Sequence, residues 1–162
     1  MGRVNIRKAT KKDLSRIAEI YVFNNRMNYW PIFKDDGFSF GELQVVTMID
    51  NYFGKDEILK NILVYDDGLI KGFVQLKERE ICKIYVDTFF QSKGIGKELI
   101  EYAINEYGAN NLWALEKNER AISFYIKHGF NLTDEKKFEE DTIEYLVHLT
   151  RWILVYSLEY KG

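Results

Sequence analysis

The chain has 162 residues, of which 46% are hydrophobic and 15% aromatic, and this composition is typical of one packed globular domain. The formal net charge is −2 with acidic and basic residues interspersed, which argues against a nucleic-acid-binding protein. A single cysteine excludes an intramolecular disulfide framework, and no cluster of His, Cys and carboxylate residues in the sequence predicts a metal site.

Neither end of the sequence has the pattern of a targeting or membrane segment. The first residues, MGRVNIRKATKKDL, lack the apolar core of a secretory signal. The most apolar run, WILVYSL, is much shorter than a bilayer span. We therefore expect a cytoplasmic domain that does not bind membranes.

The first third of the chain predicts one strand and two helices. Alternating apolar residues predict the strand within residues 3–9. Thr10 and Asp13 resemble a capping box at the start of the first helix. The apolar face of this helix consists of Leu14, Ile17, Ala18 and Tyr21. After an aromatic loop, we expect the second helix over residues 41–53.

The rest of the chain predicts most of the sheet. Three consecutive strands are expected at 61–66, 69–77 and 80–86, with Asp67-Gly68 as a strong hairpin signal. The later elements, in chain order, are a helix over 95–107, a strand over 112–116, a helix over 119–128, and strands over 130–138 and 143–150. This order predicts a single-domain α/β (α+β) fold, with a mixed, mostly antiparallel sheet flanked by helices.

The junction before the helix at 95–107 is rich in glycine. Its sequence QSKGIG, residues 91–96, leaves backbone N–H groups uncovered at a helix start, and Lys93 and Lys97 add positive charge. Such a helix start is suited to phosphate, whereas a turn whose glycines only satisfy positive φ is the alternative. The spacing does not fit a Walker loop, because Glu98 follows Lys97. It fits a dinucleotide fingerprint poorly, because Leu99 stands where a third glycine is needed.

Two neighbouring stretches carry a pair of motifs. IYVDTFFQSKGIGKELI, residues 84–100, has Gln-x-x-Gly-x-Gly after a hydrophobic strand. LWALEKNERAISFYIKHGF, residues 112–130, has a strand, an Asn, a helix carrying Tyr and a closing Gly-Phe. In this order the two motifs resemble those of the GNAT superfamily of acetyl-CoA-dependent N-acetyltransferases. The resemblance extends over the element order from about residue 3 to 150, and implies a GNAT-like domain at 1–151 with a splayed central strand pair.

The resemblance implies acetyl-CoA as co-substrate and no metal. The diphosphate would be held by the amides of Gln91, Ser92, Lys93, Gly94, Ile95, Gly96 and Lys97. The pantetheine arm would pair with the backbone of Ile84, Tyr85 and Val86. Asn118 would contact the arm from the other side, and the helix N-cap is a second role that it can fill at the same time.

The resemblance also implies direct attack of an amine on acetyl-CoA, with Tyr125 as the general acid for the departing thiolate. By spacing alone, Tyr125 would be an ordinary core aromatic residue. Glu80 falls where some family members carry the catalytic base; Glu78, a water chain, or a merely solvated role for Glu80 are the alternatives. Cys82 alternates with Ile84 and Val86, so we expect a core thiol.

The acceptor pocket of such folds lies partly in the segment between the first two helices. Tyr29, Trp30 and Phe33 are expected there as an aromatic wall, and acidic residues at 35–36 and 139–141 would suit a cationic amine. Packing of these rings against the core is the alternative. The acceptor would be a small-molecule amine, or the N-terminus or a lysine of a peptide.

Two further expectations concern the alternative function and the C-terminal residues. A non-catalytic CoA-binding or regulatory module of the same fold is the alternative function, but the presence of both Asn118 and Tyr125 favours an enzyme. Residues 152–162 follow the last expected strand. Their apolar side chains predict packing on the sheet edge or in a homodimer interface.

Overall fold

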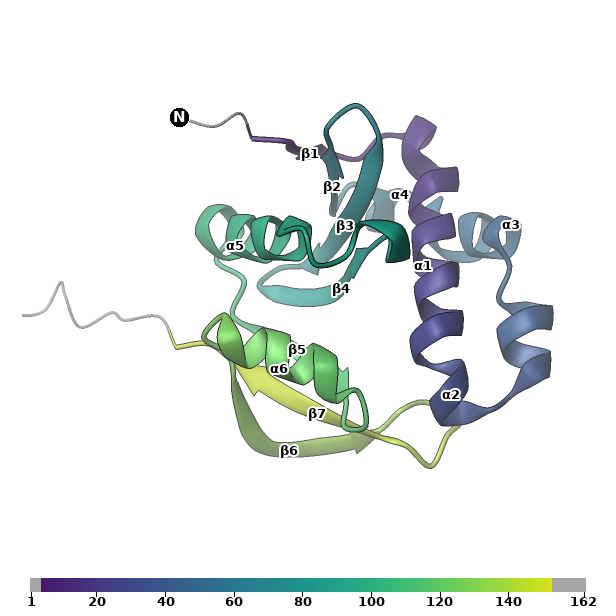
Figure 1. Cartoon of the computed structure of the whole chain (residues 1–162), viewed down its shortest axis with the longest axis vertical. Helices are drawn as coiled ribbons and strands as arrows, with labels where there is room; N and C mark the ends of the chain where they lie inside the picture. The colour runs from purple at the N-terminus through teal and green to yellow at the C-terminus, as the bar shows by residue number, and fades with distance from the viewer. Residues whose placement is uncertain (1–3, 153–162) are drawn as a thin grey trace, which may run out of the picture.

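Seven strands form one mixed sheet within residues 4–152, the part of the chain that this computed structural model describes (Figure 1). The strands are β1 (Ile6–Lys8), β2 (Ile62–Asp66), β3 (Ile70–Lys77), β4 (Glu80–Val86), β5 (Asn111–Leu115), β6 (Asn131–Phe138) and β7 (Tyr145–Thr150). Their spatial order is β1-β2-β3-β4-β5-β7-β6. Neighbouring strands are antiparallel except for the parallel pair β4 and β5. The predicted sheet type is therefore confirmed.

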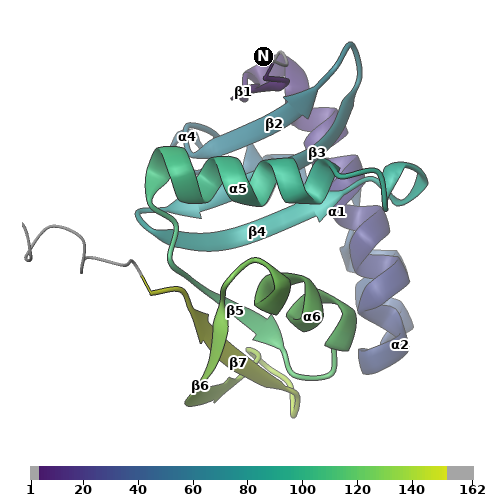
Figure 2. The same ribbon diagram turned by 60° about the vertical axis from the view of Figure 1, so that its left-hand side comes forward.

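Helices cover both faces of the sheet. They are α1 (Leu14–Asn28), α2 (Trp30–Phe33), α3 (Val45–Met48), α4 (Asp56–Leu59), α5 (Ile95–Tyr107) and α6 (Glu119–Lys127), with single turns η1 (Lys11–Asp13), η2 (Gly37–Glu42), η3 (Ile49–Phe53) and η4 (Thr88–Phe90). Figure 2 shows α5 across one face of β3 and β4, with α1 behind the opposite face. Helix α6 lies over the C-terminal strands, next to α5.

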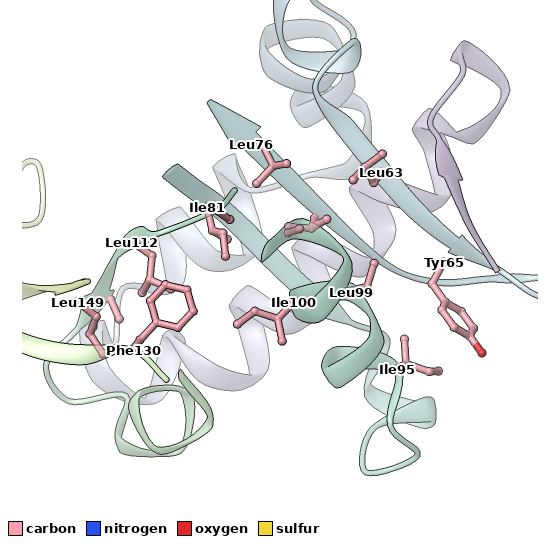
Figure 3. Close-up of a cluster of buried hydrophobic side chains, with 14 of the residues drawn as sticks. Leu63, Tyr65, Leu76, Ile81, Ile95, Leu99, Ile100, Leu112, Phe130 and Leu149 are labelled. Atoms are coloured by element: carbon pink, nitrogen blue, oxygen red, sulfur yellow. The ribbon is translucent and has the colours of Figure 1, made fainter. Parts of the chain in front are cut away.

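Alternation of side chains along β2 and β3 separates two hydrophobic clusters. Leu63 and Val74 point toward α5 and join the cluster drawn in Figure 3. Ile62 and Phe73 point toward α1 and join the second cluster. Both faces of β2 and β3 are therefore buried, and β4 pairs with this packed centre of the sheet.

The predicted capping residues begin the first helical segment. The backbone N–H of Thr10 donates to the Asp13 carboxylate at 2.7 Å, and the Arg7 guanidinium donates to the same carboxylate at 2.8 Å. Asp13 is buried, and these hydrogen bonds satisfy it. The capping box that the sequence predicts is confirmed.

The predicted helix over 41–53 is wrong in its first part. The wide turn η2 ends at Glu42, and Leu43 and Gln44 leave the helical conformation before α3 starts at Val45. The Arg26 guanidinium of α1 donates to the Ser39 carbonyl and the Leu43 carbonyl, each at 3.0 Å. These bonds, together with burial of the Leu43 side chain, stabilise the break.

Two predictions concern the outer parts of the chain. No helix among residues 4–152 is long and apolar enough to cross a bilayer. Of the predicted extension over 152–162, only Trp152 belongs to the described part of the chain, where it is exposed. Its packing on the sheet edge or in a dimer interface stays a prediction, because residues 153–162 lie outside the described residues.

Candidate active site

The central strands β4 and β5 diverge and open a cleft. They pair only at Glu80 with Asn111 and at Ile81 with Leu112. Beyond these two pairs, a cavity of about 560 Å³ lies between the strands, bounded by α1, the start of α5 and one side of α6. The structure therefore has the splayed strand pair that the motifs led us to expect.

The edge of β4 that faces the cleft is partly occupied by protein donors. The Val86 carbonyl accepts from the Asn24 amide at 2.9 Å and from the Gln91 amide at 3.2 Å. The peptide groups of a strand face the same edge at every second residue. The backbone N–H and carbonyl of Ile84 therefore also face the cleft, whereas the backbone N–H and carbonyl of Tyr85 face β3. The free hydrogen-bonding groups of this edge are therefore centred on Ile84.

Asn24 is a site residue that the sequence did not predict. It is 2% exposed on α1, and its amide bonds both its own helix, at the Ile20 carbonyl, and β4. Its carbonyl oxygen accepts from Gln91 at 3.3 Å. Asn24 thus connects α1, the end of β4 and the start of the glycine turn, and the Gln91 side chain faces these partners instead of serving as a free donor.

The glycine turn leaves an open approach to the start of α5. Gly94 has φ +86°, and a Cβ there would meet no atom within 4 Å. The first helical bond runs from the Glu98 N–H to the Gly94 carbonyl at 3.1 Å. The amides of Ile95, Gly96 and Lys97 therefore have no helical partner and are available to an anion.

Most of the predicted cofactor residues line this one cleft. The lining includes Ile84, Tyr85, Val86, Gln91, Ser92, Gly94, Ile95, Gly96, Lys97 and Asn118, together with Tyr125. Lys93 does not line it, and its ammonium lies 5.6 Å from the centre of the Phe90 ring. The two motifs, distant in sequence, thus meet in space.

Helix α6 supplies the opposite wall of the cleft. The Asn118 carbonyl oxygen accepts from the Ala121 N–H at 3.2 Å, so Asn118 is the N-cap, and its amide N–H groups are not used by this bond. Tyr125 faces the cleft, and burial raises the pKa of its phenol above the ordinary value of 10. The phenol is therefore protonated at neutral pH.

Glu80 lies at the closed end of the splayed strands and does not line the cavity. Its carboxylate accepts from the Cys82 thiol at 3.4 Å. Cys82 is the extra residue of a β-bulge, because Leu76 pairs with Ile81 and Gln75 pairs with Lys83. The thiol is half-buried at the cleft instead of deep in the core, and burial and Glu80 raise its pKa to about 11. A thiolate nucleophile is thus disfavoured.

Only one residue of the predicted aromatic wall lines the cleft. The hydroxyl of Tyr29 is 3.1 Å from the hydroxyl of Tyr85. Trp30 does not line the cavity; its indole N–H donates to Asp36 at 2.7 Å, and its ring lies 6.2 Å from that of Phe40. Phe33 is also not part of the lining.

Further cationic and aromatic residues also line the cleft. Lys83 stands on β4, and Phe124, Lys127 and His128 stand on or just after α6. The Phe124 ring would touch a Cβ at Gly96 at 3.4 Å and lies 4.7 Å from the His128 ring. Within residues 4–152, no group of three or more His, Cys, Asp or Glu side chains could hold a metal ion.

Comparison with known proteins agrees with this geometry. Residues 59–132 match the family described as "Acetyltransferase (GNAT) domain". The chain is 27% identical over 137 residues to peptidyl-lysine N-acetyltransferase YiaC of Escherichia coli, covering 80% of this chain and 84% of that one. It is 28% identical over 79 residues to peptidyl-lysine N-acetyltransferase YjaB of Salmonella typhimurium, covering 49% of this chain and 54% of that one.

Solved structures share the fold over nearly the whole chain. Apo YjaB from Escherichia coli matches with a TM-score of 0.70 and 18% identity, covering 90% of this chain and 95% of that one. The PaiA N-acetyltransferase of Thermoplasma acidophilum, solved with coenzyme A, matches with a TM-score of 0.65 and 20% identity, covering 93% of this chain and 100% of that one. The family match over residues 59–132, the shared fold and the named relatives all point to the GNAT N-acetyltransferases, a family of acyltransferases that use acetyl-CoA.

Proposed function

We propose that the chain transfers the acetyl group of acetyl-CoA to a primary amine by direct attack, with Tyr125 as general acid. The observation that carries this proposal is the meeting of three features in one cleft. These are the bare helix start after Gly94, the free backbone edge at Ile84, and Tyr125 on the opposite wall.

The residues of the cleft fit acetyl-CoA. The amides at the start of α5 and the ammonium of Lys97 would hold the diphosphate. The backbone of Ile84 would pair with the amides of the pantetheine arm, as an added strand pairs with a sheet edge. The amide N–H groups of Asn118 would donate to the arm from the other wall.

The side chains around the reaction centre favour direct attack. Bound acetyl-CoA supplies the acetyl thioester. Tyr125 holds a proton at its phenol oxygen for the thiolate that leaves, and its raised pKa keeps this proton in place at neutral pH. Cys82 is a poor alternative nucleophile because its pKa is raised to about 11. Glu80 would accept the proton of the amine only through water, since it lies outside the cavity lining.

The relatives support a lysine side chain of a peptide as one acceptor. Two of them, from Escherichia coli and Salmonella typhimurium, carry the name peptidyl-lysine N-acetyltransferase. The cleft is open between β4 and β5, so a lysine side chain that reaches in from a larger partner is compatible with it.

The test is calorimetric titration with acetyl-CoA, with NAD and ATP as controls, followed by thiol release in the presence of lysine peptides and small amines. We expect binding of acetyl-CoA and not of NAD, and amine-dependent release of the thiol. Binding without turnover for any amine would favour the non-catalytic module. Absence of acetyl-CoA binding would refute the proposal.

A pH dependence of acetyl-CoA binding follows from His128. Burial lowers the pKa of its imidazole, and Lys127 and Lys97 lower it further, against the opposing effect of Glu101. A bound diphosphate near Lys97 would raise this pKa, so the complex would take up a proton. Affinity should therefore increase as pH falls from 8 to 6, by about threefold to tenfold. Titration at both pH values measures this, and the increase should be absent in His128→Gln.

A further inference from the structure

Lys83 lies in the cleft on the sheet face opposite α5. Its ammonium is 5.1 Å from the centre of the Tyr21 ring of α1 and 4.9 Å from that of Tyr52 in η3. Both rings pack on the second hydrophobic cluster, whereas the start of α5 belongs to the first. Lys83 is therefore separated by the sheet from the proposed diphosphate site, and the anion it could bind is not the diphosphate.

The Lys83 ammonium lacks an anionic partner. Among residues 4–152, the ion pairs within 4.0 Å involve other cations, and no side-chain hydrogen bond of Lys83 is formed. Burial lowers the pKa of Lys83, and the smaller opposing effects of Cys82 and Glu139 do not cancel this decrease. The Tyr21 and Tyr52 rings compensate only part of the hydration that a half-buried cation without a counter-ion loses. A ligand carrying a negative charge would supply the rest.

A second donor lies on the same face of β4 as Lys83. The Tyr21 ring that faces the ammonium also packs on the Tyr85 ring, with centroids 5.4 Å apart. The hydroxyls of Tyr85 and Tyr29 are 3.1 Å apart, so one donates to the other and the second O–H remains free. Burial raises the pKa of both phenols, which keeps both protonated. The site thus offers one cation and one hydroxyl donor.

We propose that Lys83 and the Tyr29–Tyr85 hydroxyl pair bind a carboxylate of the acceptor, and so orient its amine toward the thioester. This inference rests on the proposed acetyl transfer. A single ammonium with one hydroxyl donor matches a monoanionic carboxylate better than a phosphate dianion, which usually takes more cations. Lys83 would determine specificity for acceptors that carry a carboxylate besides the amine.

The experiment uses pairs of acceptors that differ only in this charge. Thiol release from acetyl-CoA is measured with each of the common amino acids and its amide, and with lysine peptides in which Glu or Gln follows the lysine. We expect the preferred acid to exceed its uncharged partner in kcat/KM by about tenfold to a hundredfold, from one charge-assisted contact. In Lys83→Met, this ratio should fall to about threefold or less.

Lys77→Met is the matched control. Lys77 is an exposed lysine at the end of β3 and does not line the cleft, so its replacement removes the same charge and should keep the preference. Three results would overturn the proposal. The parent chain could acetylate acids and their amides equally well, or the preference for the acid could survive in Lys83→Met. The third is that no acceptor with a carboxylate is acetylated. Separate titration with acetyl-CoA shows whether the proposed function itself has failed. The comparison within the parent chain stands even where Lys83→Met folds poorly.

Discussion

Replacement of Tyr125 by phenylalanine is expected to lower kcat by about a hundredfold to ten-thousandfold, the usual range for loss of a general acid. The ring should keep its place, because Tyr125 packs edge-on against Phe124 and Phe130, with centroids 5.6 Å and 6.3 Å away. Affinity for acetyl-CoA should therefore change by about threefold or less. Steady-state kinetics with a saturating amine, together with calorimetric titration, separate the two quantities.

The pH profile gives a second check on the role of Tyr125. Because burial raises the pKa of the phenol above 10, its acid form should persist through the alkaline range. At pH values up to 10, kcat should therefore not decrease through loss of this proton. Tyr107→Phe is the control, because Tyr107 is exposed at the far end of α5. An active Tyr125→Phe enzyme with unchanged kcat would show that Tyr125 is only a packing residue.

The fold was predictable where local patterns determine it. The helix over 95–107 begins at the glycine turn and ends at Gly108, which has φ +67°, and both bounds agree with the sequence. The hairpin signal at Asp67-Gly68 likewise joins β2 to β3. The break at Leu43 was not predictable, because it depends on hydrogen bonds from Arg26, which lies on another helix. Local propensity carries no information about such a partner.

The site was predictable where one stretch of chain builds it. The glycine turn and α6 each form a wall from consecutive residues, so most residues of the two motifs line one cleft. Asn24 and Lys83 were missed for two different reasons. Asn24 reaches β4 only through the packing of α1 on the sheet. Lys83 follows a bulge, whose position depends on pairing with β3.

The bulge at Cys82 also explains the revised position of the thiol. Regular alternation would put Cys82 on the same face as Ile84 and Val86. The extra residue shifts the alternation, so Ile81 joins the cluster under α5 together with Ile84 and Val86, and Cys82 is left at the cleft. A period-two pattern is therefore reliable along β4 only after the bulge.

Gly94→Ala is expected to weaken acetyl-CoA binding by about tenfold to a hundredfold, equivalent to loss of one charge-assisted hydrogen bond. The new methyl group would project into the open approach to the helix start, where no protein atom lies within 4 Å. An alanine at φ +86° is also strained, so the free energy of unfolding should fall by about 1–2 kcal/mol. Calorimetric titration and denaturant unfolding measure the two effects.

Gly68→Ala separates backbone strain from obstruction of the site. Gly68 has φ +114°, a Cβ there would also meet no atom within 4 Å, and the residue lies in the hairpin between β2 and β3, outside the cleft lining. Its replacement should cost a similar free energy of unfolding and leave the affinity for acetyl-CoA unchanged. If both variants lost affinity equally, the loss would reflect general destabilisation. If neither did, the amides after Gly94 would not hold the diphosphate.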